Sequence, residues 1–240
     1  MEIQIAVAKI NKHDTIESGD TLEYVERPNG GISVVLADAQ VSDQAAKPIS
    51  LSVVRKVTSL LAEGVRDGAS ARAASDFLYT ERNGKVAAYL SIISVDLQTC
   101  TIVISRNNPT PTFVAFGEQI ECLSGESTPI GTTRNIRPAI SEISLETGIT
   151  VMTFTHGLIR AGMNFGLSFD PCTLLEALLE EQEPQAQSIA DTVLYEAIRL
   201  DNNKPQNDMS VVVLRVLGKA SDSIRRMTIH LPYSSPDVNA

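Results

Sequence analysis

The order in which two hydrophobic periods occur along this chain is its most constraining feature. Apolar and polar residues alternate in the first forty residues, as in Glu2–Ile10, where Ile3, Ile5 and Val7 share one face. This period of two predicts half-buried β-strands. Between residues 49 and 65 the apolar spacing changes to three and four, which predicts an amphipathic helix, and later it changes back.

The same two patterns predict the remaining elements. Predicted strands cover Glu2–Ile10, Thr21–Glu26, Ile32–Ala37, Val86–Asp96, Thr101–Ser105, Thr112–Phe116, Ile120–Leu123, Ala139–Leu145, Ile149–Thr155, Val211–Val216 and, as a last short strand, Arg225–Leu231. Predicted helices cover residues 49–65, Ala69–Leu78, Leu174–Leu179 and Ile189–Leu200.

This succession does not follow the strict β-α-β alternation of a parallel, doubly wound sheet. It favours an α+β fold, a four-layer αββα sandwich in which two mostly antiparallel sheets stack between flanking helices. No internal repeat and no linker divides the chain. We therefore expect one domain over residues 1–217, followed by a C-terminal extension over residues 218–240 with one short strand.

Composition excludes several classes of protein. Hydrophobic residues make up 43% of the chain, enough for a globular core, and the net charge of −9 argues against nucleic acid as a partner. The three cysteines show neither a disulfide framework nor the spacing of a zinc site, which favours reduced thiols. No signal peptide and no membrane-spanning run is recognisable. We expect a soluble, cytoplasmic protein that does not bind membranes.

Three acidic residues are placed where a metal site could form. Asp20 precedes the second predicted strand, Asp38 ends the third, and Asp208, beside Asn207, precedes the last core strand. Carboxylates at neighbouring strand ends can assemble the oxygen ligands that Mg²⁺ or Mn²⁺ requires. Each residue alone also has an ordinary explanation, because Asp often caps the backbone in turns.

Six short elements occur in a consistent order over roughly residues 1 to 217. They are Ser18-Gly19-Asp20, Val34-Val35-Leu36-Ala37-Asp38, Ser105-Arg106-Asn107-Asn108-Pro109-Thr110-Pro111, Ser127-Thr128-Pro129-Ile130-Gly131, Thr153-Phe154-Thr155-His156-Gly157-Leu158 and Asn207-Asp208-Met209-Ser210 followed by Val211-Val212-Val213. Together these elements resemble the metal-dependent PPM-type (protein phosphatase 2C-like) Ser/Thr phosphatases. The bacterial SpoIIE/RsbU/RsbX branch is the most similar.

The resemblance implies a site with two divalent ions, Mn²⁺ or Mg²⁺, that activate a bridging water against a phosphate group. Asp38 would bridge the two metals and Asp20 would act mostly through metal-bound water. Ala39 stands where the family has a glycine whose carbonyl binds the second metal. The remaining ligands would come from the family's "TDG" and "DD" elements, which fall at His156 and Asn207 in this sequence.

His156 and Asn207 depart from the family pattern, since both positions should carry aspartate. The two substitutions remove two negative charges, which should favour Mn²⁺, Fe²⁺ or Zn²⁺ over Mg²⁺. Asp208 could replace the lost ligand through a one-residue shift, provided that a bulge turns its side chain to the correct face. His156 itself has three interpretations: a metal ligand, a general acid for the leaving oxygen, or a neutral residue at a decayed site.

The resemblance thus predicts a protein serine/threonine phosphatase that acts on a bacterial regulatory phosphoprotein of the STAS, anti-anti-sigma or stressosome type. The alternative is a pseudophosphatase that binds such a phosphoprotein without hydrolysing it. A third, weaker hypothesis is a hydrolase of small phosphoesters. The alternating segment Arg225–Leu231 also offers an edge for a homodimer.

Overall fold

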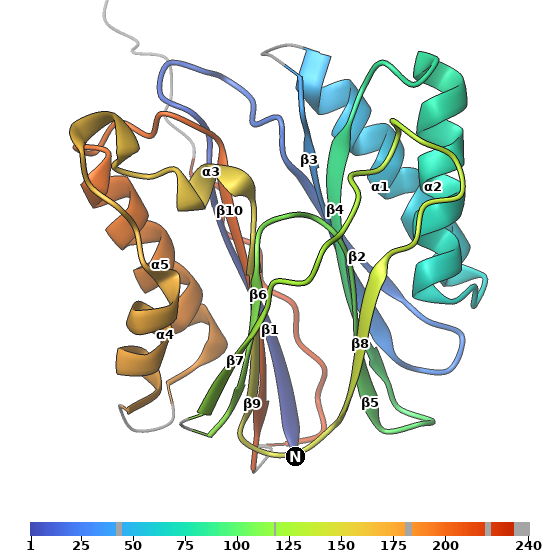
Figure 1. Ribbon diagram of the computed structural model, residues 1–240. Coiled ribbons are helices and arrows are strands. Elements are labelled where there is room, and N and C mark those ends of the chain that lie inside the picture. The colour runs from blue at the N-terminus through green and yellow to red at the C-terminus, as the bar shows by residue number, and fades with distance from the viewer. Residues whose placement is uncertain (42–44, 118, 181–183, 219–221, 233–240) are drawn as a thin grey trace, which may run out of the picture.

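Two antiparallel five-stranded sheets stack face to face in the computed structural model, which describes residues 1–41, 45–117, 119–180, 184–218 and 222–232 (Figure 1). The first sheet has the order β1-β10-β9-β6-β7, with β1 (Glu2–Ile10), β10 (Met209–Leu217), β9 (Ile149–Phe154), β6 (Thr112–Phe116) and β7 (Gln119–Leu123). The second has the order β2-β3-β4-β5-β8, with β2 (Thr21–Glu26), β3 (Ile32–Ala39), β4 (Ala88–Asp96), β5 (Thr101–Asn107) and β8 (Ala139–Ser144).

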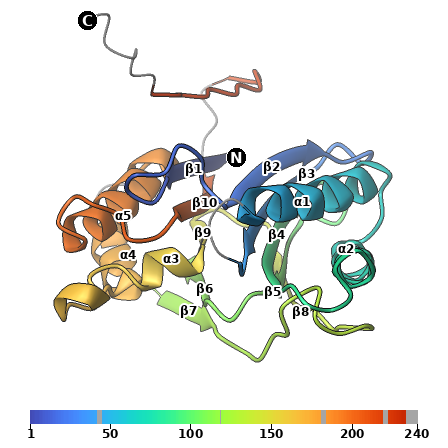
Figure 2. The same ribbon diagram turned by 90° about the horizontal axis from the view of Figure 1, so that it is seen from above.

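Helices form the two outer layers. Helices α1 (Ala46–Ala62) and α2 (Asp67–Arg82) cover the second sheet, and α4 (Pro171–Glu180) and α5 (Ala186–Leu200) cover the first (Figures 1 and 2). One apolar cluster fills the space between the sheets, and one lies beneath each helical layer. The predicted αββα sandwich is therefore confirmed. Within the residues described, no helix is both long enough and apolar enough to cross a membrane.

The burial of each strand explains its pattern of apolar and polar residues in the sequence. All nine residues of β10 are buried, because β10 is flanked by two strands and covered on both faces. A strand in that position reads as a continuous apolar run. The edge strand β8 instead alternates half-buried and exposed residues, which gives the period of two.

Some predicted boundaries were wrong, and one predicted strand is absent. The second helix begins at Asp67 and ends at Arg82, rather than covering Ala69–Leu78. Arg225–Leu231 was predicted to be a strand, but it pairs with no strand in the described part of the chain. Alternation of side chains is insufficient for a strand when no neighbouring strand supplies the backbone hydrogen bonds. Two short helices, α3 (His156–Ile159) and the 3₁₀ helix η2 (Met163–Phe165), were not predicted.

A buried ion pair ties the α2 helix to the second sheet. The Arg27 guanidinium donates to Asp67 Oδ2 at 3.2 Å, and both side chains are almost fully buried. The Ser94 hydroxyl donates to the other oxygen of the same carboxylate. Asp67 is the first residue of α2, so this network fixes the start of the helix against β3 and β4.

Candidate metal centre

All six residues that the sequence suggested as metal ligands line one cleft of about 980 Å³. The cleft lies at one end of the sandwich, where the β1–β2 loop, the end of β3, the start of α3 and the start of β10 converge. Its lining comprises Lys12, Asp14, Thr15, Ile16, Glu17, Gly19, Asp20, Asp38, Ala39, Gln40, Val41, Ala46, Lys47, His156, Gly157, Arg160, Asn207 and Asp208. Segments up to 196 residues apart in sequence thus form a single site.

Asp38 lines the cleft with a carboxylate that forms no ion pair among the described residues. It lies near the end of β3, opposite Tyr89 of β4, and its side chain is half-buried. Burial, followed by repulsion from Asp20, raises the pKa of Asp38 to about 7, although the peptide N–H of His156 opposes the shift. Burial and a neighbouring like charge both disfavour the ionised form. Asp38 is therefore only partly ionised near neutral pH.

Asp20 is almost completely buried behind Asp38, and hydroxyl groups occupy one of its oxygens. Asp20 Oδ2 accepts hydrogen bonds from Thr155 Oγ1 at 2.9 Å and from Ser210 Oγ at 2.7 Å. Burial raises the pKa of Asp20 to about 6, and the two hydroxyl hydrogen bonds limit that rise. Oδ2 therefore serves to join β9 and β10 to the β1–β2 loop.

Two lysines hold the backbone of the Asp20 loop. Lys9 Nζ donates to the Asp20 carbonyl at 2.7 Å, and Lys47 Nζ donates to the same oxygen at 3.0 Å. Ser50, one turn further along α1, donates to the Gly19 carbonyl at 2.5 Å. Burial and the neighbouring Lys47 lower the pKa of Lys9. Two ammonium groups thus bring positive charge to the side of the cleft where the family resemblance places a metal.

Asp208 is engaged by the backbone of the β1–β2 loop. Its Oδ1 accepts from the Lys12 N–H and its Oδ2 from the Gly19 N–H, each at 2.8 Å. The β1–β10 register continues without interruption from Glu2–Leu217 to Ile10–Met209, so no bulge shifts the strand beside Asp208. The bulge considered from the sequence is absent from this pairing. Asp208 caps the loop instead, the ordinary function of aspartate in turns.

Gly157 allows the start of α3 to contact the start of β10. A Cβ atom at Gly157 would lie 2.0 Å from the Asp208 carbonyl oxygen and 2.9 Å from Asn207 Cβ. No real side chain tolerates such a distance to backbone. Glycine at this position therefore sets how closely His156 and Asn207 approach across the cleft.

His156 is the first residue of α3 and packs against an aromatic ring. Its ring lies edge-on to Tyr89, with the ring centroids 6.0 Å apart. Burial, followed by the positive charge of Arg160, lowers the pKa of His156, so its imidazole is neutral at physiological pH. In a neutral imidazole one nitrogen donates a hydrogen bond and the other accepts one, and the ring supplies no charge to balance a metal.

These residues do not fit a two-metal centre. Among the residues that the structure describes, no three His, Cys, Asp or Glu side chains are grouped closely enough to hold a metal ion. Of the predicted ligand positions, Asp20 and Asp38 remain, while Asp208 is bound to two backbone N–H groups and positions 156 and 207 are uncharged. The two further carboxylates of the lining, Asp14 and Glu17, are exposed and are not grouped with them. Two divalent ions bring four positive charges, which these groups cannot balance.

Sequence reasoning missed the residues that organise the acidic pair. Thr155 and Ser210 were quoted only as parts of motifs, and their hydroxyls proved to be the partners of Asp20. The Lys9 and Lys47 contacts depend on how the Asp20 loop lies against β1 and the start of α1, which has no local sequence signal. Tyr89 could have been found only from the pairing of β3 with β4.

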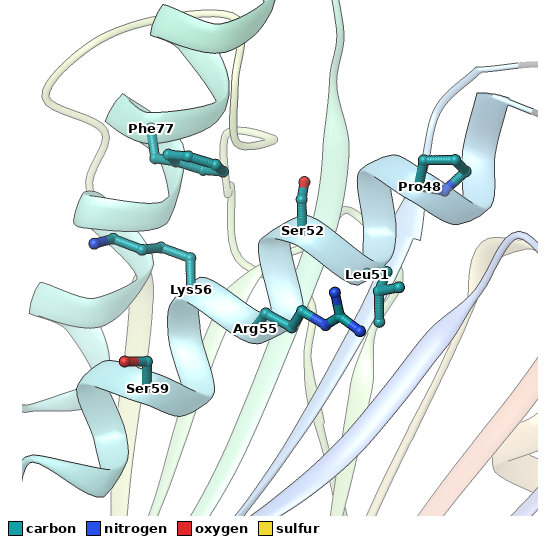
Figure 3. Close-up of a pocket in the computed structure, with 7 residues that line it drawn as sticks. All are labelled: Pro48, Leu51, Ser52, Arg55, Lys56, Ser59 and Phe77. Atoms are coloured by element: carbon teal, nitrogen blue, oxygen red, sulfur yellow. The ribbon is translucent and has the colours of Figure 1, made fainter.

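A second hollow lies outside this cleft, between α1 and α2 (Figure 3). It is a shallow groove of about 570 Å³ and has no acidic residue in its lining, which comprises Pro48, Leu51, Ser52, Arg55, Lys56, Ser59 and Phe77. None of the predicted metal ligands contributes to it. The groove therefore provides a useful reference surface for experiments on the cleft.

Comparison with known proteins identifies the family. The family model described as Stage II sporulation protein E (SpoIIE) matches residues 28–217. Stage II sporulation protein E of Priestia megaterium is 19% identical over 214 residues, which cover 89% of this chain and 36% of that protein. The chain therefore spans about a third of the length of this curated relative.

Solved structures agree on the fold. The PP2C phosphatase domain of SpoIIE from Bacillus subtilis, solved with a fragment of its regulatory domain, has a TM-score of 0.78 at 18% identity, covering 91% of this chain and 64% of that one. RsbX in complex with magnesium has a TM-score of 0.68 at 13% identity, covering 88% and 94%. The family match and the αββα sandwich lead to one assignment: the chain belongs to the SpoIIE family of PP2C-like serine/threonine phosphatase domains.

Proposed function

We propose that this domain is a pseudophosphatase that binds a serine- or threonine-phosphorylated regulatory protein in the Asp38 cleft without a two-metal centre. The observation that carries the proposal is the composition of the cleft. Three carboxylates of the cleft have other partners: Asp208 accepts from two backbone N–H groups, hydroxyl groups hold one oxygen of Asp20, and Asp14 contacts His13. Lys9 and Lys47 donate to the Asp20 carbonyl, and among the described residues no three possible ligands are grouped closely enough for a metal ion. Hydrolysis by this family depends on metal-activated water, so loss of the metals leaves phosphoprotein binding as the activity.

Basic side chains at the cleft offer direct contacts to a phosphate group. Lys47 donates one hydrogen bond to the Asp20 carbonyl, and its ammonium group has two further donors. Arg160 also lines the cleft, near the neutral His156. Lysine and arginine bind phosphate oxygens through charge-assisted hydrogen bonds. These groups can therefore take over the recognition of phosphate that metals perform in an active phosphatase.

The family suggests the class of the partner. We expect a bacterial regulatory phosphoprotein of the STAS, anti-anti-sigma or stressosome type. One neighbour of known structure, from Mycobacterium tuberculosis, joins RsbU and RsbW domains in a single protein, with a TM-score of 0.74 at 14% identity. That arrangement is consistent with signalling through protein–protein contacts.

A metal-dependent serine/threonine phosphatase is the second candidate, and the Asp20–Asp38 pair favours it. Repulsion from Asp20 contributes to the raised pKa of Asp38, so a divalent cation between the two carboxylates would relieve an unfavourable interaction. Asp38 and Asp20 would hold such an ion, and Ala39 lines the same cleft. The chemistry supplied would be that of a Lewis acid at the phosphate group.

Two assays on the intact protein distinguish the candidates. Phosphate release from a phosphorylated STAS-domain protein is measured with Mn²⁺, Mg²⁺, Fe²⁺ or Zn²⁺, for wild type and Asp38→Ala. Binding of the phosphorylated and unphosphorylated forms of that protein is measured by calorimetry in EDTA. We expect no metal-dependent release and preferential binding of the phosphorylated form.

The matched variants are Lys47→Met and Lys56→Met, because both lysines are on α1 but Lys56 lies in the α1–α2 groove. Loss of a charge-assisted contact should weaken phosphoprotein binding about tenfold in Lys47→Met and leave it unchanged in Lys56→Met. Metal-dependent release that disappears in Asp38→Ala would establish the phosphatase instead. Equal affinity for the phosphorylated and unphosphorylated STAS-domain protein in EDTA would contradict the proposal that this domain binds a phosphoprotein.

A further inference from the structure

The segment Ile224–Leu231, called here the C-terminal segment, exposes four large apolar side chains, the last three of which alternate with polar residues. Ile224, Met227, Ile229 and Leu231 have exposed fractions of 63%, 61%, 79% and 86%. Figure 2 shows the red chain beyond β10 standing apart from both sheets. Four such side chains within eight residues exceed the scattered surface apolar residues of an ordinary monomer.

This segment lies outside the residues that match the family model. The SpoIIE family match ends at residue 217, the last residue of β10, and the cleft uses no residue beyond Asp208. The segment is therefore not needed to complete the sandwich or the cleft. Its period of two is nevertheless the pattern of a β-strand, and a strand needs a sheet edge as its partner.

Strand β2 provides the edge that best matches the segment in charge. β2 lies at the end of the second sheet and, within the described residues, pairs only with β3. It carries two acidic residues, Glu23 and Glu26, and no basic one. Each of the other edge strands, β1, β7 and β8, has a single acidic residue, and β1 also has a lysine. The C-terminal segment contributes Arg225 and Arg226.

One antiparallel register also matches the side chains. Leu22, Tyr24 and Glu26 share a face of β2, and Tyr24 is exposed by 46%. With Arg225 opposite Glu26, the next residues on the same face of the segment come opposite Tyr24 and Leu22. These residues are Met227 and Ile229, so one ion pair is followed by two apolar pairs. Such cross-strand pairs are the units that stabilise antiparallel sheets.

The ion pair of this register already exists within one molecule. Arg225 donates to Glu26 at 2.8 Å, and both side chains are more than half exposed. An ion pair exposed to this extent holds the chain only weakly. The rest of the segment remains solvent-exposed, away from its own β2. Within the described residues, each molecule therefore has a segment with the alternation of a strand but no strand partner, and an open edge at β2.

We propose that the C-terminal segment of one copy adds as an antiparallel strand to the β2 edge of a second copy, with Arg225 opposite Glu26. A two-fold axis lets each copy donate one segment and receive one, so that both apolar faces are covered at once. The occupant of the β2 edge is thus a second copy of this chain, and the result is a homodimer by strand exchange.

The test is sedimentation velocity of the full chain over a range of concentrations. We expect wild type to dimerise and Met227→Asp to raise the dimer dissociation constant at least about tenfold. The matched control is Met163→Asp, since Met163 is exposed by 60% on η2, against 61% for Met227. The control should dimerise as wild type does, and both variants should retain the wild-type melting temperature of the monomer.

Charge-reversal variants test whether the C-terminal segment pairs with the β2 edge, and whether it does so between two copies. Glu26→Arg alone and Arg225→Glu alone each place like charges opposite one another in a homodimer, so each should be monomeric. A mixture of the two variants should dimerise again, because both exchanged pairs then have opposite charges. A monomeric wild type, an equal loss in Met163→Asp, or a mixture that stays monomeric would each overturn the proposal. The last result would show that the pair acts only within one molecule.

Discussion

Replacing Asp38 with asparagine should stabilise the metal-free protein at alkaline pH. Asparagine has the size of aspartate but removes the charge that burial and Asp20 disfavour. Moving the pKa of a carboxyl group from 3.8 to about 7 corresponds to roughly 4 kcal/mol of free energy. Part of this is offset, because the peptide N–H of His156 loses a charged acceptor. We expect a net gain of about 2 kcal/mol at pH 8 in EDTA.

The pH dependence follows from the direction of the shift. A carboxyl group with a raised pKa binds a proton more tightly in the folded state than in the unfolded state. Asp38 therefore favours folding at acidic pH, and its contribution is lost as the pH rises from about 4 through about 7. The stability gain in Asp38→Asn should accordingly be large at pH 8 and much smaller at pH 5.

Urea unfolding at both pH values measures the effect. The control is Asp191→Asn, because Asp191 is exposed on α5, outside the cleft, and should change stability by less than about 0.5 kcal/mol. An Asp38→Asn variant that is less stable than wild type at pH 8 would refute the argument. A gain of the same size at both pH values would also refute it, since titration of Asp38 could not then be its cause.

Three further substitutions test how the cleft and the second sheet are held. Asp208→Ala should lower the free energy of unfolding by about 1–3 kcal/mol, because two backbone N–H groups lose their acceptor; unchanged urea unfolding would contradict the capping function. Gly157→Ala should lower the free energy of unfolding by more than about 3 kcal/mol, seen as a lower melting temperature. Gly125→Ala should be near neutral, because the nearest atom outside the adjacent residues lies 4.0 Å from an added Cβ. Arg27→Met should lower the free energy of unfolding by about 3–5 kcal/mol, because Asp67 would remain buried without its cationic partner. A smaller loss in chemical unfolding would mean that the hydrogen bond from Ser94 is enough to stabilise the buried Asp67 carboxylate.

The fold was largely readable from the sequence because its strands differ in a regular way. Central strands such as β10 are buried on both faces and read as apolar runs, and edge strands such as β8 alternate. Helix α1 shows the spacing of a helix packed on one side. These patterns depend on local burial, so they survive in a sequence that is only 19% identical to its curated relative.

The sequence failed where pairing, rather than periodicity, decides the structure. Arg225–Leu231 alternates as a strand should, yet no described strand lies beside it in one molecule. Helix α3 was not predicted, because its four residues are too few to show a period of 3.6. An element of that length exists through the contacts that Gly157 permits with the start of β10.

The same distinction applies to the cleft. The sequence by itself determined which residues meet there, since the family's motif order placed Asp20, Asp38, His156 and Asn207 at four converging strand ends. Only the tertiary structure decided how each is used. Asp208 caps a loop, hydroxyl groups hold one oxygen of Asp20, and two lysines stand beside that residue, because hydrogen-bond partners come from segments distant in the chain. Charge balance in a buried site depends on those distant partners, which no local sequence pattern records.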